Sequence, residues 1–403
     1  MTSMTKVLVF VGRQHHAQKL QSIASELQRR EIEVRYVNSN NATNSDPSSE
    51  YIWDFTTQPL HLYDYFNHHS VEQVDRLVAG LSQYSAGYKL LESIAPFWTT
   101  FSIREACELV IGWESLIQIE KPDAVIGLHS NNAFFRPLLY TAHSKGIKTF
   151  CTQEGLLRHR DQQTQNKQSS AVDYVNTLFT WSESDRSSYL NAGVDSKTIV
   201  PVGPFHLDDQ IKVRNSTEFT QRQAQFKHSF GFKFDKPLVS FMPPVSNRYQ
   251  GDFSRALVEL SKYCTENLIQ LMIRLHPFDY PIRNEVKKLL KPYKVQYYEH
   301  DNGNWLTLFS DAVITQNSTS AYESLFLMTP VIELDLDRIG ITESIANQSL
   351  ATLIEDGELS KINDVLNGKF ETESLNQWRL LNSNLADGNS TNRAVDYILG
   401  AIR

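Results

Sequence analysis

The feature that most constrains the fold is an alternation of short apolar runs with helical patterns, repeated in two series along the chain. The first series opens with an apolar run at 6–12, a segment with helical periodicity at 16–32 and a second apolar run at 33–37. Such runs are typical of parallel strands buried on both faces, and the helices between them are the crossovers that parallel strands require. The sequence therefore predicts an α/β fold with doubly wound parallel sheets.

The alternation continues through both halves of the chain. Further strands are expected at 122–128, 147–155, 174–182, 236–244, 268–277, 295–299 and 330–335, the last clear strand. Helices are expected over 70–121, with apolar spacing clearest at 105–120, and at 131–146, 183–193, 251–267 and in the tail from about 370. The charged, apolar-poor stretch at 210–236 is interpreted as the region between two domains.

A chain of 403 residues is too long for one ordinary core, so two domains are expected. We predict two Rossmann-like domains, at 1–205 and 206–385, and a C-terminal helix at 386–403 that packs back on the first domain. Two such domains would face each other across a cleft. Ligands would then bind at the carboxyl ends of the strands.

Composition excludes several classes of protein. The net charge of −7 argues against a nucleic-acid partner held by phosphate neutralisation. No apolar run approaches the roughly 20 residues that cross a bilayer, so any membrane contact is expected to be peripheral. The 3 cysteines are widely spaced, which fits reduced core thiols in a cytoplasmic protein, at most at the inner face of a membrane, better than disulfides or a zinc site.

A polar loop interrupts an apolar strand and the helix that follows it in the second half. Asn317, Ser318, Thr319 and Ser320 stand before a helix expected to begin near Ala321. Amides at a helix N-terminus, with added hydroxyls, form a binding site for phosphate, although ordinary capping also selects Ser and Thr.

Two further features of the second half fit the same site. Glu323 is expected in the first turn of that helix, where it either binds ribose hydroxyls or complements the helix dipole. At the end of the strand at 268–277, Arg274 and His276 precede a proline that ends the strand. Both are candidate nucleotide contacts, and His276 would stabilise a departing phosphate unless it is an ordinary loop histidine.

The candidate general base lies in the first half. Glu154 leaves an apolar strand between Gln153 and Gly155, and the glycine is expected to permit an unusual backbone angle that directs the carboxylate into the cleft. A solvated loop glutamate is the alternative. Residues that follow strand ends and are expected to contact substrate are Gly12, His15, His16, His129, Gln153, Gly155 and Arg158.

A short acidic pattern in the second half resembles a metal-binding motif. Asp335 and Asp337 match the Asp-x-Asp pattern by which some sugar-transfer enzymes hold a divalent ion. The pattern occurs often by chance and lies beyond the proposed phosphate loop. No His/Cys cluster has metal-ligand spacing, so neither a metal nor another cofactor is predicted.

The arrangement resembles the GT-B class of glycosyltransferases. The stretch 179–209 looks like the exit from the first domain in many bacterial members, and the order Gln153-Glu154-Gly155, His276-Pro277 and Ser318-Thr319-Ser320 is similar to bacterial sialyltransferases, polysialyltransferases and capsule Kdo transferases. The resemblance implies that Glu154 is the base, His276 a phosphate contact and the hydroxyl loop a phosphate site. Gln153 departs from these families, which usually have a second acid there.

This resemblance implies a metal-independent, inverting transfer of a sugar from a nucleotide donor to a glycan acceptor in bacterial surface polysaccharide synthesis. A CMP-activated acidic sugar or a UDP-sugar would be the donor. Three alternatives remain open: a UDP-N-acetylhexosamine 2-epimerase, a teichoic-acid-type polyol-phosphate transferase, and a non-catalytic glycan-binding subunit. The sequence leaves the oligomeric state undetermined.

Overall fold

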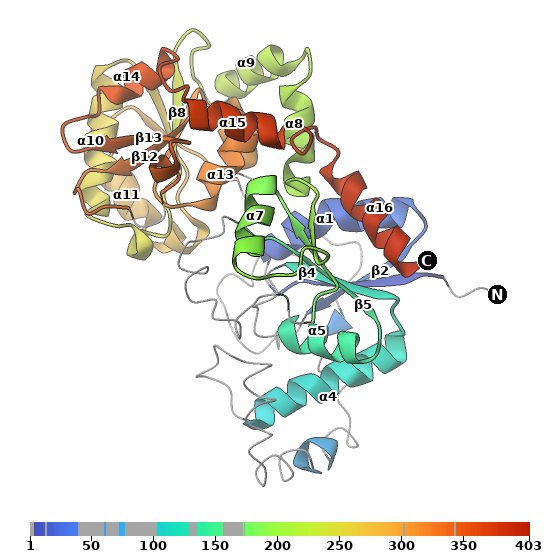
Figure 1. The fold of residues 1–403 in the computed structure, drawn as a ribbon. Helices are drawn as coiled ribbons and strands as arrows, with labels where there is room; N and C mark the ends of the chain where they lie inside the picture. Colours follow the sequence, from blue (N-terminus) through green and yellow to red (C-terminus); the bar gives the residue numbers. More distant parts are fainter. Residues whose placement is uncertain are drawn as a thin grey trace. The chain divides into compact units, whose positions relative to one another are not determined.

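A computed structural model describes residues 4–12, 14–38, 60–61, 72–76, 103–128, 135–155, 172, 174–300, 303–341 and 344–403. These residues form two compact units. The first unit holds the described residues of Met1–Glu154, Asp161–His206 and Asn389–Arg403, and the second holds those of Gly155–Arg160 and Leu207–Gly388. In each unit helices cover both faces of a parallel sheet, which confirms the predicted fold class (Figure 1).

The first unit is built on a 7-stranded sheet with the order β3-β2-β1-β4-β5-β6-β7. Its strands, all parallel to their neighbours, are β1 Lys6–Phe10, β2 Glu33–Asn38, β3 Leu60–His61, β4 Ala124–Leu128, β5 Lys148–Thr152, β6 Thr177–Thr180 and β7 Ile199–Pro201. The strand order reverses direction between β1 and β4. In sheets of this type, ligands bind beyond the carboxyl ends of the strands at such a switch point.

Helices of the first unit pack through apolar faces with helical spacing. They are α1 Gln14–Arg29, α4 Ile103–Glu120, α5 Phe135–Ser144, α7 Glu183–Asn191 and α16 Ser390–Ile402. Leu20, Ala24 and Leu27 of α1 lie in one core cluster with Val395 and Ile398 of α16. Figure 1 shows α1 and α16 on one face of the sheet and α4 and α5 on the other. The C-terminal helix therefore belongs to the first unit.

The second unit is built on a 6-stranded parallel sheet with the order β10-β9-β8-β11-β12-β13. Its strands are β8 Leu238–Phe241, β9 Gln270–Ile273, β10 Val295–Tyr297, β11 Ala312–Thr315, β12 Val331–Asp335 and β13 Thr352–Glu355. The order reverses between β8 and β11, so the loops that follow these two strands lie at the switch point.

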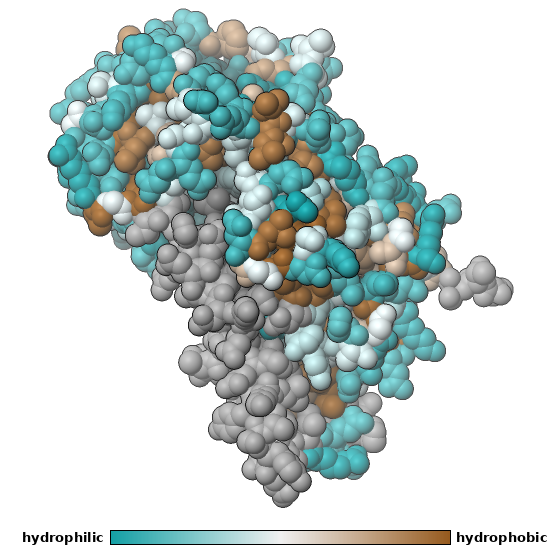
Figure 2. All heavy atoms as spheres, viewed as in Figure 1, coloured by the Kyte–Doolittle hydropathy of each residue, from teal (hydrophilic) through white to brown (hydrophobic). Residues whose placement is uncertain are grey.

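Helices of the second unit cover the two faces of its sheet. They are α8 Asp208–Arg214, α9 Phe219–Ser229, α10 Phe253–Glu266, α11 Arg283–Leu289, α12 Asn304–Phe309, α13 Thr319–Phe326, α14 Lys361–Leu366 and α15 Glu373–Asn382. Residues of α10, α11 and α14 share one core cluster with the sheet. Figure 2 shows mostly hydrophilic residues on the outward side over these three helices, as amphipathic helices require.

Two sequence predictions about the second half are wrong. The stretch 210–236 is not a linker, because α8 and α9 belong to the second unit and Phe226 and Phe230 pack against its core. Large aromatic side chains one helical turn apart make the contact with the core. The prediction failed because it relied on the number of apolar residues, which is low in this stretch. The strand at 330–335 is not the last, because β13 pairs with β12 in parallel.

In the described part of the chain, no helix combines the length and the apolar character that a membrane crossing requires.

Candidate functional site

A carboxylate and an imidazole meet at the carboxyl edge of the first sheet. Glu154 follows β5, and His16 lies in the first turn of α1, directly after β1. The His16 Nε2 atom lies 3.4 Å from Oε1 of Glu154. The imidazole is 3% exposed and the carboxylate side chain 31% exposed, so the buried ring orients an acid group that still reaches solvent. A carboxylate held in this way can remove a proton from a bound substrate.

The backbone around Glu154 is fixed by its neighbours. The Lys19 ammonium donates to the carbonyl oxygen of Glu154 at 2.6 Å and lies 5.0 Å from the ring centre of Trp181. The backbone N–H of Trp181 donates to Oε1 of Gln153 at 3.0 Å. The ends of α1, β5 and β6 are therefore tied together, and buried Gln153 has a structural role beside its predicted one.

The other predicted residues of the first half are placed as follows. Gly12 is buried directly after β1, and Gly155 is half-buried after Glu154. The backbone φ of Gly155 lies outside the left-handed region that favours glycine, so the predicted unusual angle is wrong. His15 lies in α1, but its side chain, together with His129 and Arg158, falls outside the described residues.

The hydroxyl loop of the second unit forms a helix N-terminus at the switch point. Ser318 is the N-cap of α13, and its hydroxyl accepts from the backbone N–H of Ser320. The hydroxyl oxygens of Ser318 and Ser320 lie 2.9 Å apart. Thr319, the first helical residue, is half-buried. The end of α13 therefore concentrates backbone amides, hydroxyls and the positive end of the helix dipole, which together can bind a phosphate.

The position of Glu323 on this helix differs from the prediction. The helix begins at Thr319, two residues before the expected start, so Glu323 lies beyond its first turn. The Glu323 side chain is almost completely buried, since α13 is covered on all sides from Ser320 to Phe326. The cap at Ser318 starts the helix early because its hydroxyl satisfies the Ser320 amide.

The turn after β9 positions the predicted phosphate contact His276. His276 caps a short 3₁₀ helix, η5 Pro277–Ile282, and its Nδ1 accepts from the backbone N–H of Phe278 at 3.2 Å. In the neutral ring this bond places the proton on Nε2, which can then donate to an anion. Arg274 packs over the start of α12, where a Cβ at Gly303 would lie 2.9 Å from the Arg274 Nε.

Sequence reasoning missed the loop that follows β8 at the same switch point. Gln316 is fully buried, and its amide binds both the backbone N–H and the carbonyl of Gln250. The carboxylate of Asp279, also buried, accepts from the backbone N–H and hydroxyl of Ser246 at 2.8 and 2.5 Å. These contacts join the loops after β8, β9 and β11. Polar residues that follow apolar strands, such as Gln316 after β11, were the available sequence signal.

A groove lies along the β8 loop and η5. Its volume is about 340 Å³. The residues that line it are Val245, Ser246, Asn247, Arg248, Phe278, Asp279 and Ile282. The aromatic ring of Phe278 and the side chain of Arg248 therefore line a groove next to the turn that begins at His276.

The acidic pair Asp335 and Asp337 is occupied by protein contacts. Asp335 accepts from the backbone N–H groups of Ile339 and Gly340 at 3.0 and 2.9 Å. Asp337 accepts from the guanidinium of Arg255 at 2.9 Å. Within the described ranges, no three His, Cys, Asp or Glu side chains gather as a metal site would require.

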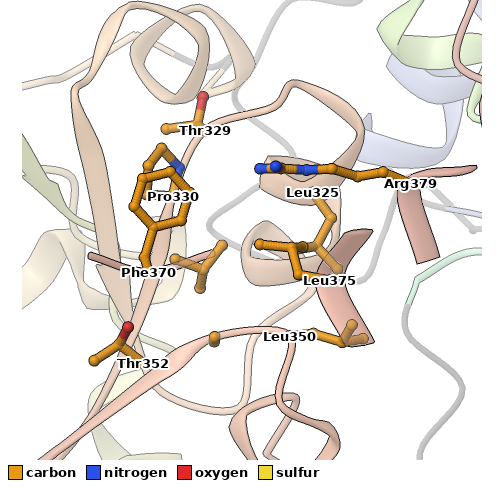
Figure 3. Close-up of a pocket in the computed structure, with 10 residues that line it drawn as sticks. Leu325, Thr329, Pro330, Leu350, Thr352, Phe370, Leu375 and Arg379 are labelled. Carbon is orange, nitrogen blue, oxygen red and sulfur yellow. The ribbon is translucent and has the colours of Figure 1, made fainter. Parts of the chain in front are cut away.

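A second cavity lies behind α13, between this helix, β12 and α15 (Figure 3). In Figure 3, Arg379 reaches across from α15 toward Leu325 and Pro330. The cavity has a volume of about 10 Å³, which holds no more than one water molecule. This cavity is too small for a sugar nucleotide.

Comparison with known proteins finds similarity in structure alone. No family model matches the sequence, and no curated protein matches it. Among solved structures, the UDP-GlcNAc 2-epimerase from Neisseria meningitidis bound to UDP-GlcNAc is 14% identical, with a TM-score of 0.63 and coverage of 98% of this chain and 100% of that chain. The 2-epimerase from Methanocaldococcus jannaschii is 16% identical, with a TM-score of 0.62 and coverage of 98% and 99%.

The wall teichoic acid polymerase TagF is also similar, at 14% identity and a TM-score of 0.60, with coverage of 99% of this chain and 88% of that chain. These likenesses show that the chain has a GT-B-like two-domain α/β fold. The similar structures do not single out the sialyltransferase and Kdo transferase families.

Proposed function

We propose that this protein acts on a UDP-N-acetylhexosamine as a 2-epimerase, inverting the configuration at C2 of the sugar. The observation that carries the proposal is the full-length structural similarity to several 2-epimerases, one of them bound to UDP-GlcNAc. The glycosyltransferase reading of the sequence becomes the second candidate.

The second unit supplies the features that a nucleotide diphosphate requires. The diphosphate would bind at the N-terminus of α13, on the backbone amides and the hydroxyls of Ser318 and Ser320. His276 would donate from Nε2 to the phosphate oxygen that leaves the sugar. Glu323 and Arg274 remain candidates for the ribose and the phosphates, respectively.

The first unit supplies the proton transfer. The C2–H bond of a hexosamine has no neighbouring carbonyl that would make it acidic, but the adjacent C1 carries a good leaving group. Glu154 would take the C2 proton while the C1–O bond breaks, with its electron pair passing to UDP and a C1=C2 bond forming. The UDP oxygen then re-forms its bond to C1 as a solvent-derived proton adds to the opposite face of C2, and Glu154 releases its proton to solvent. His16 orients the carboxylate throughout.

The test needs no acceptor. The purified protein is incubated with UDP-GlcNAc in D₂O, and proton NMR follows the sugar. Appearance of the C2 epimer with deuterium at C2 is the expected result, because the abstracted proton exchanges with solvent. If neither epimer nor deuterium appears while UDP binds, the 2-epimerase proposal is wrong.

A metal-independent inverting glycosyltransferase is the second candidate, favoured by the half-exposed Glu154 carboxylate and by the similarity to a polymerase. Glu154 would then take the proton of an acceptor hydroxyl, whose oxygen forms a bond to C1 as the nucleotide leaves from the opposite face. Thermal shift with UDP, CMP, CDP and GDP identifies the donor. Release of UDP or CMP that depends on an added glycan acceptor would favour this candidate over the epimerase.

A further inference from the structure

Glu333 is a carboxylate in the middle of a buried strand that no part of the proposed function uses. It lies on β12, whose residues are all buried, and is itself 1% exposed. Buried carboxylates are rare unless hydrogen bonds stabilise them. Burial raises the pKa of the Glu333 carboxyl, and hydrogen bonds donated to it oppose that rise.

The contacts of Glu333 divide between its two oxygens. Oε1 accepts from the backbone N–H of Asn317 at 3.3 Å. Oε2 accepts from the backbone N–H of Ala346 at 3.0 Å and from the hydroxyl of Ser344. One oxygen therefore holds the loop that precedes α13, and the other holds the loop that follows β12.

Asn317 is the residue at which the loop needs support. Its φ of +45° lies in the left-handed region, which asparagine adopts more readily than other residues with a side chain. Directly after it, Ser318 returns to an extended conformation as the cap of α13. The direction in which the first amides of α13 point thus depends on a turn whose backbone N–H is held by Glu333.

We propose that Glu333 is a positioning residue for the nucleotide: by binding the Asn317 amide it holds the turn that presents Ser318–Ser320 to the diphosphate. The proposal rests on the proposed function only for the identity of the ligand. A neutral amide in place of the carboxylate keeps one acceptor oxygen for Ala346 and Ser344. Its NH₂ group then faces the Asn317 N–H, so two donors oppose each other.

The test compares Glu333→Gln with Asp335→Asn, a matched control two residues along the same strand. Asp335 is also buried and also accepts from two backbone amides, but these belong to Ile339 and Gly340, away from the α13 loop. Titration calorimetry with UDP should show about tenfold weaker binding for Glu333→Gln, the loss of one charge-assisted hydrogen bond. Binding by Asp335→Asn should stay within about twofold of the parent.

Hydrogen exchange of the unliganded proteins gives a readout that needs no nucleotide. Amides of 316–320 should exchange faster in Glu333→Gln and at the parental rate in Asp335→Asn. Equal exchange in both variants, or equal loss of UDP affinity in both, would overturn the positioning role. If the parent binds no UDP but Glu333→Gln still exchanges faster at 316–320, the proposed function is wrong. The role of Glu333 in holding the Asn317 turn then still stands.

Discussion

Glu154 of the first unit and three carboxylates of the second unit are placed in opposite ways. At the carboxyl edge of the first sheet, the side chain of Glu154 remains 31% exposed and is paired with a histidine. At the corresponding edge of the second sheet, Asp279, Glu333 and Asp335 are all at most 4% exposed, and each accepts backbone N–H groups. Glu154 is presented to solvent, whereas these three carboxylates of the second unit bind its own backbone.

The proposed function would account for this difference. A carboxylate exposed beside the α13 N-terminus would repel a phosphate, whereas a buried one that binds backbone amides repels it less and fixes the loops. A general base must instead reach its substrate. The proposed function places chemistry in the first unit and nucleotide binding in the second, and the following variants test that division.

The largest effect is expected for Glu154→Gln. Loss of the base should lower kcat by about 1,000-fold, within the range for general base catalysis. UDP binding should stay within about twofold, because the contacts assigned to the nucleotide lie in the second unit. Steady-state kinetics and calorimetry measure the two quantities. If affinity and rate fell together, the division of labour between the units would be wrong.

The next effect is expected for His276→Asn. Asparagine is a good capping residue, so its side-chain oxygen can still accept from the Phe278 amide and keep the turn. Asparagine has no group at the position of Nε2, so the proposed hydrogen bond to the leaving phosphate is lost. The value of kcat/KM should fall about 100-fold while the melting temperature changes little. A variant with parental kinetics would remove His276 from the site.

A smaller effect is expected for Ser318→Ala, which removes the cap of α13 and one donor to the phosphate. UDP affinity should fall about tenfold and stability by about 1 kcal/mol. The control is Ser324→Ala on the same helix, whose buried hydroxyl bonds the carbonyl of Ser320. It should cost stability without changing UDP affinity, and equal losses of affinity would contradict a phosphate site at the helix end.

The smallest effect is expected for Glu26→Gln, at the opposite end of α1 from His16. Hydrogen bonds from Arg29 and Arg30 lower the pKa of Glu26 to about 2. The folded pKa is below the unfolded one, so the stabilisation is complete above about 4.5 and is lost as the pH falls toward 2.

Because these contacts lie near the surface, Glu26→Gln should cost less than about 1 kcal/mol at pH 7. Urea unfolding at pH 7, 5 and 3 should show the difference from the parent shrinking with falling pH. UDP affinity and turnover should not change. A constant difference at all three pH values would show that the lost interaction is not ionic.

Hydrophobic periodicity, which depends only on neighbours along the chain, determined most of the fold. It located β1, β2, β4 and β8 and predicted parallel sheets with helical crossovers, because apolar runs of strand length and helical faces are local signals. It failed where a few aromatic side chains do the packing, as in α9, and where a strand is only partly buried, as in β13.

Some features of the candidate site were likewise visible in the sequence, and others only in the structure. The sequence by itself pointed to Glu154, His276 and the loop at 317–320, since polar residues after apolar strands are visible locally. Only the tertiary structure showed that Glu154 pairs with His16 and that Lys19 donates to the Glu154 carbonyl. It also showed that the Asn317 backbone N–H donates to Glu333. Strand order decides which ends become neighbours, and contacts between residues far apart in the chain leave no periodic trace in the sequence.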